Sequence, residues 1–293
     1  MYHYTSTEGL LGILNSGQLR ATDLRYLNDT SELHFGLAEM LSRYELTSQS
    51  PNRRTPFSDN LAKRYKIENW KDLGTLTAYE AGRLPRDRFD PIARAIVNSL
   101  EETMLIGVAC FCGNGDLLSQ WRGYGAAGYA LGFDAQDLRH IVRQRYLPLT
   151  SVTYGRAAAR QPLRRVDDLL DQAPAQASGR LPKHVTLSLL GMAAQIKDPA
   201  FESENEFRIG DVAAEDLQRW KYRGGSLGVV PYLDIDLRKP DTDLMPLREI
   251  FLAPGPEVAL RETAVRALLR TRGYPVSGSG GVNVKPSSIP FRG

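Results

Sequence analysis

The 293-residue sequence predicts a fold of the α+β class, with strands and helices dispersed along the chain. Short apolar segments with alternating parity, such as 104–112 and 128–134, are typical of strands. Apolar residues at helical spacing, such as Leu10, Leu11 and Leu14 and those of 257–272, are typical of amphipathic helices. Strict β-α-β alternation is nearly missing, and this favours α+β over a doubly wound sheet.

The N-terminal segment predicts a strand that runs straight into a helix. Tyr2 and Tyr4 fall on one side of the strand, and His3 falls on the other. Residues 5–8 then fit a capping box, and an apolar stripe follows until Gly17, a residue typical of helix C-termini.

The rest of the chain predicts further elements in order. A second helix follows Asp29, and residues 45–90 predict loops and short helices. The later segments predict a strand at 104–112, a glycine-punctuated loop at 113–125, a strand at 128–134, basic helical pieces with a low-complexity loop at 135–200, and a strand at 201–210. The last segments predict a strand at 247–254, a helix at 257–272 with Ala264, Val265, Leu268 and Leu269 inward, and a final strand at 282–291.

Composition is that of a globular protein, with 42% hydrophobic and 24% charged residues. The formal charge of +3 fits an anionic ligand but excludes a dedicated, strongly basic nucleic-acid-binding chain. Cys110 and Cys112 are too close along a strand for a normal disulfide, which suggests a reducing compartment. No apolar run approaches the roughly 20 residues of a membrane span, and the N-terminus lacks signal-peptide features, so a cytoplasmic protein without a membrane partner is expected.

The segment "FESENEFRIG" (201–210) raises a question about charge. In an extended strand it would place Glu202, Glu204 and Glu206 on one face, about 7 Å apart. One interpretation is a solvated face, or a face paired with arginines such as Arg208. The other is a site of paired carboxylates, in which one anion stabilises a developing positive charge and its neighbour handles a proton.

Other candidate residues also admit two interpretations. His3 is either a structural hydrogen-bonding residue or part of a site. Trp121 and Tyr124 are either core aromatics or a flat surface for a planar heterocycle. The basic residues of 139–145 predict a solvated helix face, with phosphate binding as the alternative.

The "CFC" stretch has two possible chemical uses. Cys112 as a nucleophile would need a nearby base. No metal is expected, because zinc would need further ligands at suitable spacing.

Several of these motifs occur together in a known pattern. A widespread bacterial family of uncharacterised proteins resembles this chain in "YHYTS", "LND" with Glu32, "ACFC" followed by Trp121 and Tyr124, the segment of Glu204, Glu206 and Arg208, and "SSIPF". The order of the motifs also resembles the ADP-ribosyltransferase superfamily. That resemblance implies a single domain over 1–293 with a split, twisted β-sandwich core and helical insertions at about 36–104 and 135–200.

The second resemblance implies roles for individual residues, with NAD as the substrate. His3, with Thr5, would hold the adenosine ribose, and Cys112 would stand where the family has a serine. Trp121 or Tyr124 would pack against nicotinamide. Glu206 would be the catalytic glutamate, and Glu204 would serve the acceptor.

The resemblance also gives the glutamates a chemical purpose. Cleavage of the nicotinamide–ribose bond produces an oxocarbenium-like cation, and a carboxylate stabilises it more than the ground state. The expected function is therefore transfer of ADP-ribose from NAD to an unknown protein or nucleic-acid acceptor, as in a bacterial toxin, effector or anti-phage defence component. The alternatives are an NAD glycohydrolase and a non-enzymatic nucleotide or nucleic-acid sensor with the same fold.

Overall fold

The computed structural model describes residues 1–27, 35–36, 106–124, 128–155, 183–213, 216–225, 227–278 and 280–290. The chain divides into two compact units. The first comprises Met1–Leu24, Ile106–Ser151 and Ser203–Gly293, and the second comprises Arg25–Leu105 and Val152–Glu202. Both units contain helices and strands, which confirms the predicted α+β class.

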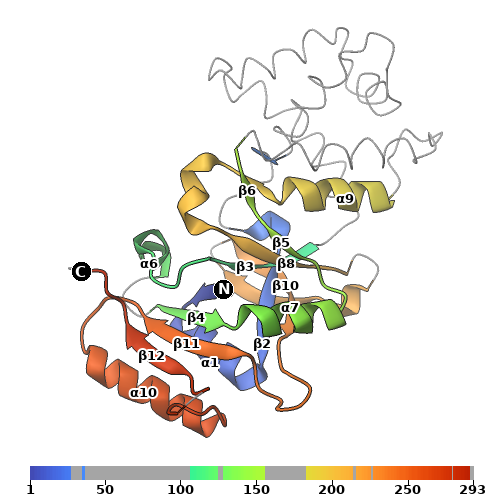
Figure 1. The fold of residues 1–293 in the computed structure, drawn as a ribbon. Coiled ribbons are helices and arrows are strands. Elements are labelled where there is room, and N and C mark those ends of the chain that lie inside the picture. Colours follow the sequence, from blue (N-terminus) through green and yellow to red (C-terminus); the bar gives the residue numbers. More distant parts are fainter. Residues whose placement is uncertain are drawn as a thin grey trace, which may run out of the picture. The chain divides into compact units, whose positions relative to one another are not determined.

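Two sheets form the first unit (Figure 1). The four-stranded sheet has the order β1 (Tyr2–Thr5), β4 (Tyr129–Phe133), β11 (Leu247–Leu252) and β12 (Asn283–Pro286). The six-stranded sheet has the order β5 (Leu149–Ser151), β8 (Phe207–Val212), β3 (Ile106–Phe111), β2 (Gln18–Asp23), β10 (Gly228–Asp236) and β9 (Lys221–Gly225). All pairs within these sheets are antiparallel except β11 with β12.

A bridge between Tyr2 and Cys112 joins the two sheets of the first unit. Tyr2 at the start of β1 exchanges both backbone hydrogen bonds with Cys112, just after β3, at 2.9 and 2.7 Å. Away from this bridge β1 and β3 diverge. β1 pairs with β4 along its whole length, whereas β3 pairs with β2 through Gly107 and Val108. The β structure is therefore split between β1 and β3.

Among its described residues, the first unit also has four helices and two short 3-10 turns. The helices are α1 (Thr7–Ser16), α6 (Leu118–Tyr124), α7 (Ala135–Gln144) and α10 (Val258–Thr271), and the turns are η1 (Leu24–Tyr26), which runs on into the second unit, and η3 (Leu217–Arg219). Helix α1 begins where predicted, because Ser6 accepts a hydrogen bond from the Gly9 amide. It ends at Gly17, whose φ of 67° suits glycine best.

Two helix predictions for the first unit are wrong in part, and the final strand predicted at 282–291 is observed only as β12. Residues 118–124 form the helix α6 within the segment predicted to be a loop. Gly123 lies within this helix and does not interrupt it. In α10, Val265 and Leu269 are buried as predicted, but Ala264 is exposed. Its position lies off the stripe that faces the sheet, and a methyl group is too small for its exposure to cost much.

The second unit contains α9 (Lys183–Ala193), the short parallel pair of β6 (Thr153–Tyr154) and β7 (Ile196–Lys197), and the 3-10 turn η2 (Pro199–Glu204), which runs on into the first unit. Gly36 lies against the end of α9, since a Cβ there would come within 2.1 Å of the Ala193 carbonyl oxygen. The predicted second helix lies outside the described residues except for 35–36, which are helical. The predicted loops of 45–90 lie wholly outside them.

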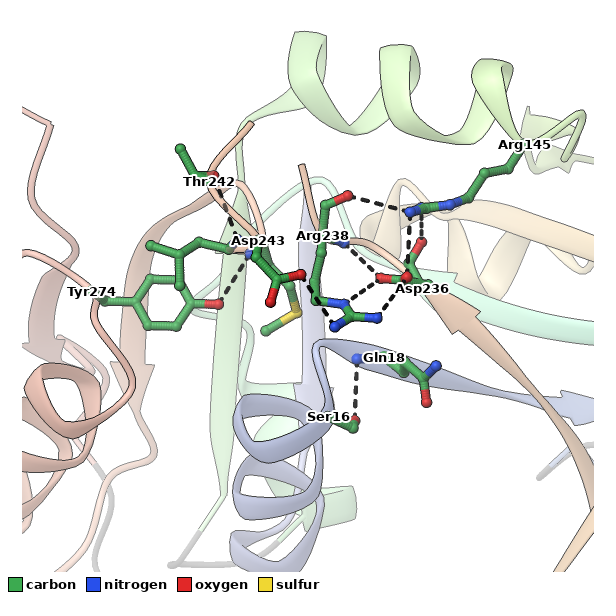
Figure 2. Close-up of polar contacts among 10 residues, drawn as sticks. Ser16, Gln18, Arg145, Asp236, Arg238, Thr242, Asp243 and Tyr274 are labelled. Atoms are coloured by element: carbon green, nitrogen blue, oxygen red, sulfur yellow. Dashed lines mark hydrogen bonds and ion pairs between the residues drawn. The ribbon is translucent and has the colours of Figure 1, made fainter. Parts of the chain in front are cut away.

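An ion-pair network fixes the end of β10 in the first unit (Figure 2). The Arg238 guanidinium binds both carboxylate oxygens of Asp236 at 3.0 Å and also pairs with Asp243 at 3.2 Å. Arg145, which follows α7, donates to the backbone carbonyls of Asp236 and Arg238. Arg145 thus has a structural role, whereas Arg139 and Arg143 are exposed, as a solvated helix face predicts.

None of the helices within the described ranges is long and apolar enough to cross a membrane.

Candidate functional site

His3 lies where β1 leaves β3. Its Nδ1 is 2.9 Å from the Cys110 carbonyl oxygen, and its ring lies 5.8 Å from the ring of Phe111. Because a carbonyl oxygen only accepts, Nδ1 carries the proton in this bond. Burial lowers the pKa of His3, and the hydrogen bond to Cys110 opposes that shift without reversing it. The neutral imidazole therefore presents Nε2 as an acceptor.

Cys112 and Trp121 belong to the core of the first unit. They pack with Tyr4, Ala130 and Ala253, and the rings of Tyr4 and Trp121 meet edge to face at 4.8 Å. Tyr4 also donates to the Asn114 carbonyl and accepts from the Leu117 amide. The aromatic pair thus fixes the loop after β3 against β1.

Asp116 is the polar centre of that loop. Its carboxylate accepts from the Trp121 indole at 2.7 Å and from the hydroxyls of Ser287 and Ser288 and the Ser288 amide. Burial alone would raise the pKa of Asp116, but these hydrogen bonds lower it overall. The serines of the "SSIPF" stretch therefore anchor the C-terminal segment to the loop, a structural role that the sequence analysis did not assign.

The predicted glutamate strand is wrong over its first half. Residues 199–204 form the 3-10 turn η2, and Asn205 has a left-handed φ of 41°, so β8 begins only at Phe207. The Asp198 carboxylate accepts from the Ala200 amide and so caps the turn, which Pro199 also favours at its first position. Glu202 and Glu204 therefore do not continue the strand face of Glu206.

Glu206 forms a buried ion pair with Arg208. Arg208 Nε lies 2.6 Å from Glu206 Oε1, and its NH2 lies 3.0 Å from Oε2. Both side chains are almost fully buried, at 6% and 4% exposure for Arg208 and Glu206. Arg208 lies opposite Cys110 on β3 and Thr150 on β5. The guanidinium is thus held between two neighbouring strands, and it fixes the carboxylate in place.

Two hydrogen bonds hold Glu204 against the segment after β3. Its backbone carbonyl accepts from the Gly113 amide at 3.1 Å, and its carboxylate accepts from the Gln120 side chain of α6 at 3.0 Å. Gln120, which the sequence analysis did not single out, therefore positions Glu204. In the sequence, the only indication of a role for Gln120 is its position next to Trp121.

The remaining candidates occupy other places. Thr5 is buried at the end of β1, where a Cβ on Gly9 would come within 1.9 Å of its hydroxyl oxygen. This contact explains the glycine in the first turn of α1. Tyr124 ends α6, and its side chain lies outside the described residues.

Strand alternation determines which candidates share a face. The Tyr2–Cys112 bridge and the Cys110–Arg208 register put Arg208 on the face of Tyr2 and Cys112. His3 lies on the alternate face with Phe111. The structure therefore brings Cys112, Trp121 and the Glu206–Arg208 pair to one face, and places His3 at the split on the other.

Within the described parts of the chain, no group of three or more His, Cys, Asp or Glu side chains could hold a metal ion. A fixed carboxylate can stabilise a cation, a neutral imidazole can accept a hydrogen bond, and a second glutamate lies two residues away from the first.

One family model matches the chain. It is described as "Protein of unknown function (DUF2971)", and it covers residues 120–209. The match runs from α6 to β8 and so includes Trp121, Glu204 and Glu206, but not His3 or Cys112. No curated protein and no solved structure matches the chain.

Proposed function

We propose that the protein is an NAD-dependent ADP-ribosyltransferase, with Glu206 as the residue that stabilises the ribosyl cation. The observation that carries the proposal is the buried ion pair of Glu206 with Arg208 at the start of β8. A carboxylate fixed by a guanidinium stays charged away from water and needs no reorganisation when positive charge develops nearby.

The split between β1 and β3 supports the same proposal. Read through the Tyr2–Cys112 bridge, the strands follow the order β5-β8-β3-β1-β4-β11, with the two parts diverging after the bridge. We take this divided arrangement as the split core that an ADP-ribosyltransferase would have. NAD would pass through the place where β1 and β3 part, with its ribose near His3 on one face of the strands and its nicotinamide end near Glu206 on the other.

The candidate residues then take separate roles. The Nε2 of neutral His3 accepts a hydrogen bond from a hydroxyl of the adenosine ribose, with Thr5 beside it on β1. Trp121 and Cys112 support the nicotinamide side from the core, and Tyr124, at the end of α6, is the further aromatic candidate for contact with the ring.

The reaction balances with the acceptor as the nucleophile. The bond between the nicotinamide nitrogen and the ribose C1′ breaks, and neutral nicotinamide leaves with the electron pair. A new bond forms between C1′ and an oxygen or nitrogen of the acceptor, and Glu204, held by Gln120, receives the proton that the acceptor loses. With water in place of the acceptor, the same steps make the protein an NAD glycohydrolase.

The setting of such an activity is also part of the proposal. Cys110 and Cys112 are both reduced thiols, which fits a cytoplasmic protein. Transfer of ADP-ribose to a macromolecule in that compartment fits a bacterial toxin, an effector or an anti-phage defence component.

Incubation of the purified protein with NAD and a cell extract tests the proposal. Release of nicotinamide together with labelled macromolecule supports the transferase. Nicotinamide with free ADP-ribose supports the glycohydrolase, and an unchanged NAD pool overturns both and leaves the non-enzymatic sensor.

A further inference from the structure

The hairpin of β9 and β10 carries exposed aromatic, aliphatic and basic side chains. Tyr222 is 63% exposed and Val229 is 66% exposed. Gly224 pairs with Val229, and a Cβ at Gly224 would meet nothing within 4 Å. Since Tyr222 and Val229 are diagonal neighbours on one face, they form an open shelf with the bare backbone of Gly224 between them. A flat ring could lie on this shelf.

Basic side chains lie on the opposite face of the same hairpin. Lys221 pairs with Tyr232 and Arg223 with Val230, so the two cations share one side. Arg20 of β2 joins them, with its guanidinium 5.0 Å from the centre of the Tyr232 ring. Arg223 donates to two neutral oxygens, the Gly224 carbonyl and the Thr22 hydroxyl. Neither contact neutralises the positive charge of Arg223, because both acceptors are uncharged.

The balance of charge around the hairpin favours an anionic partner. Among the described residues, Arg20, Arg219, Lys221 and Arg223 lie around the hairpin, and two of them pair with acids: Lys221 with Asp234 and Arg219 with Asp211, while Asp216 caps η3. Arg20 and Arg223 add two further positive charges. In sheet order β9 is the last strand of the described sheet, so cations and shelf flank the same open edge.

We infer that the β9–β10 hairpin binds single-stranded nucleic acid. A base stacks on Tyr222 and Val229, and the phosphates lie against Arg20, Lys221 and Arg223. A nucleic-acid base has a flat apolar face that can stack on the shelf, and the phosphates of the nucleic-acid backbone carry the negative charge that pairs with the arginines. An acidic peptide would satisfy only the cations, and a duplex keeps its bases stacked away from Tyr222. The inference goes beyond the proposed enzymatic function, because the hairpin would bind in the absence of NAD.

Direct binding of a labelled oligothymidylate of about 12 nucleotides, followed by fluorescence anisotropy without NAD, tests the inference. We expect Tyr222→Ala to weaken binding about tenfold, through loss of stacking. Arg223→Gln should reduce the slope of log K against log salt by about 0.7, the value for one phosphate contact on a single strand. The thermal melt of Tyr222→Ala should match the wild type, because Tyr222 is exposed, and that of Arg223→Gln should shift little, because half-buried Arg223 makes only two long hydrogen bonds, of 3.3 and 3.4 Å.

Two matched substitutions on another surface complete the test. Tyr146, which follows α7, is 95% exposed, and Arg143 is exposed on α7. Tyr146→Ala and Arg143→Gln should leave affinity and salt slope unchanged. Equal effects of these variants, equal binding of polyglutamate, or no oligonucleotide binding at low salt would each overturn the inference. So would wild-type self-association that Tyr222→Ala abolishes, because the shelf would then be a contact between two copies.

Discussion

Two carboxylates of the first unit, Asp116 and Glu206, are held in different ways. Asp116 accepts hydrogen bonds from Trp121, Ser287 and Ser288, and so joins segments far apart in the sequence. Glu206 binds the guanidinium of Arg208, two residues along the same strand. The hydrogen bonds of Asp116 connect the loop after β3 to the C-terminal segment, whereas the ion pair of Glu206 joins two residues of one short segment.

The difference separates architecture from chemistry. Hydrogen bonds between distant segments explain Asp116 through folding alone. A buried ion pair within one strand adds little stability over an apolar pair of the same size, because desolvation offsets the attraction. Glu206 is therefore the better candidate for a reaction, and Asp116 for the framework around it. Substitution of Asp116 should therefore lower stability alone, whereas substitution of Glu206 should lower both stability and the rate of the reaction.

The largest effect is expected from Glu206→Gln. The neutral amide loses the charge that stabilises the ribosyl cation, so nicotinamide release should fall by about 10²–10³-fold. A chromatographic assay of nicotinamide measures it. Glu202→Gln is the matched control, because Glu202 is exposed on η2 and should retain full activity. Equal rates for the two variants would remove Glu206 from the reaction.

Asp116→Ala should mainly lower stability. It leaves the buried Trp121 indole and the Ser287 hydroxyl without their acceptor, at a cost of about 3 kcal/mol in the free energy of unfolding. Urea denaturation measures this change. Asp243→Ala, which removes an exposed partner of Arg238, should cost under about 1 kcal/mol. A small effect of Asp116→Ala would mean that the loop is held by other contacts.

Glu204→Gln should act on the acceptor step. Labelling of macromolecules should fall about tenfold, while hydrolysis of NAD to free ADP-ribose falls less, because the cation still forms at Glu206. Labelled NAD measures both products in one reaction. Gln120→Ala should shift the ratio of products in the same direction, since Gln120 positions Glu204. A parallel loss of both products would place Glu204 in the first step instead.

The smallest effect concerns pH and His3. The folded pKa of His3 lies below its ordinary value of about 6.5, so the unfolded chain binds the proton first. Stability should therefore fall as pH decreases below about 6.5, with a slope of at most about 1.4 kcal/mol per pH unit from this residue, until the folded pKa is reached. His3→Gln should flatten the slope in denaturation series at several pH values. An unchanged slope would show that His3 is not protected from protonation.

The strongly patterned elements of the first unit could be predicted from the sequence. The strand of Tyr2 and His3, the helix capped by Ser6, and the buried strand before Cys112 all follow local periodicity. The strands β2, β9 and β10 were not predicted. β9 has one aromatic residue, Tyr222, among charged residues and glycines, and Pro231 interrupts the pattern of β10. Pro231 is accommodated because β10 pairs with β2 only from Tyr232 onwards.

The candidate site could be predicted only in its residue types. Glu206 and Arg208 share a face, as their spacing predicts. The left-handed Asn205, which separates Glu206 from Glu204, depends on local backbone geometry that a period-two pattern does not reveal. The anchoring of Asp116 by Ser287 and Ser288 spans more than 170 residues of sequence, so no local pattern could indicate it.

The double variant Glu206→Gln/Arg208→Met tests the central claim most directly. Glu206→Gln alone removes one partner of a buried ion pair, which destabilises a protein by about 3–5 kcal/mol, whereas removal of both charges costs far less. Nicotinamide release and the free energy of unfolding are measured on the wild type, the single variant and the double variant. The account predicts that the double variant regains stability while nicotinamide release stays about 10²-fold or more below the wild type. Release that returns together with stability would show that the ion pair serves folding alone and would contradict a catalytic Glu206.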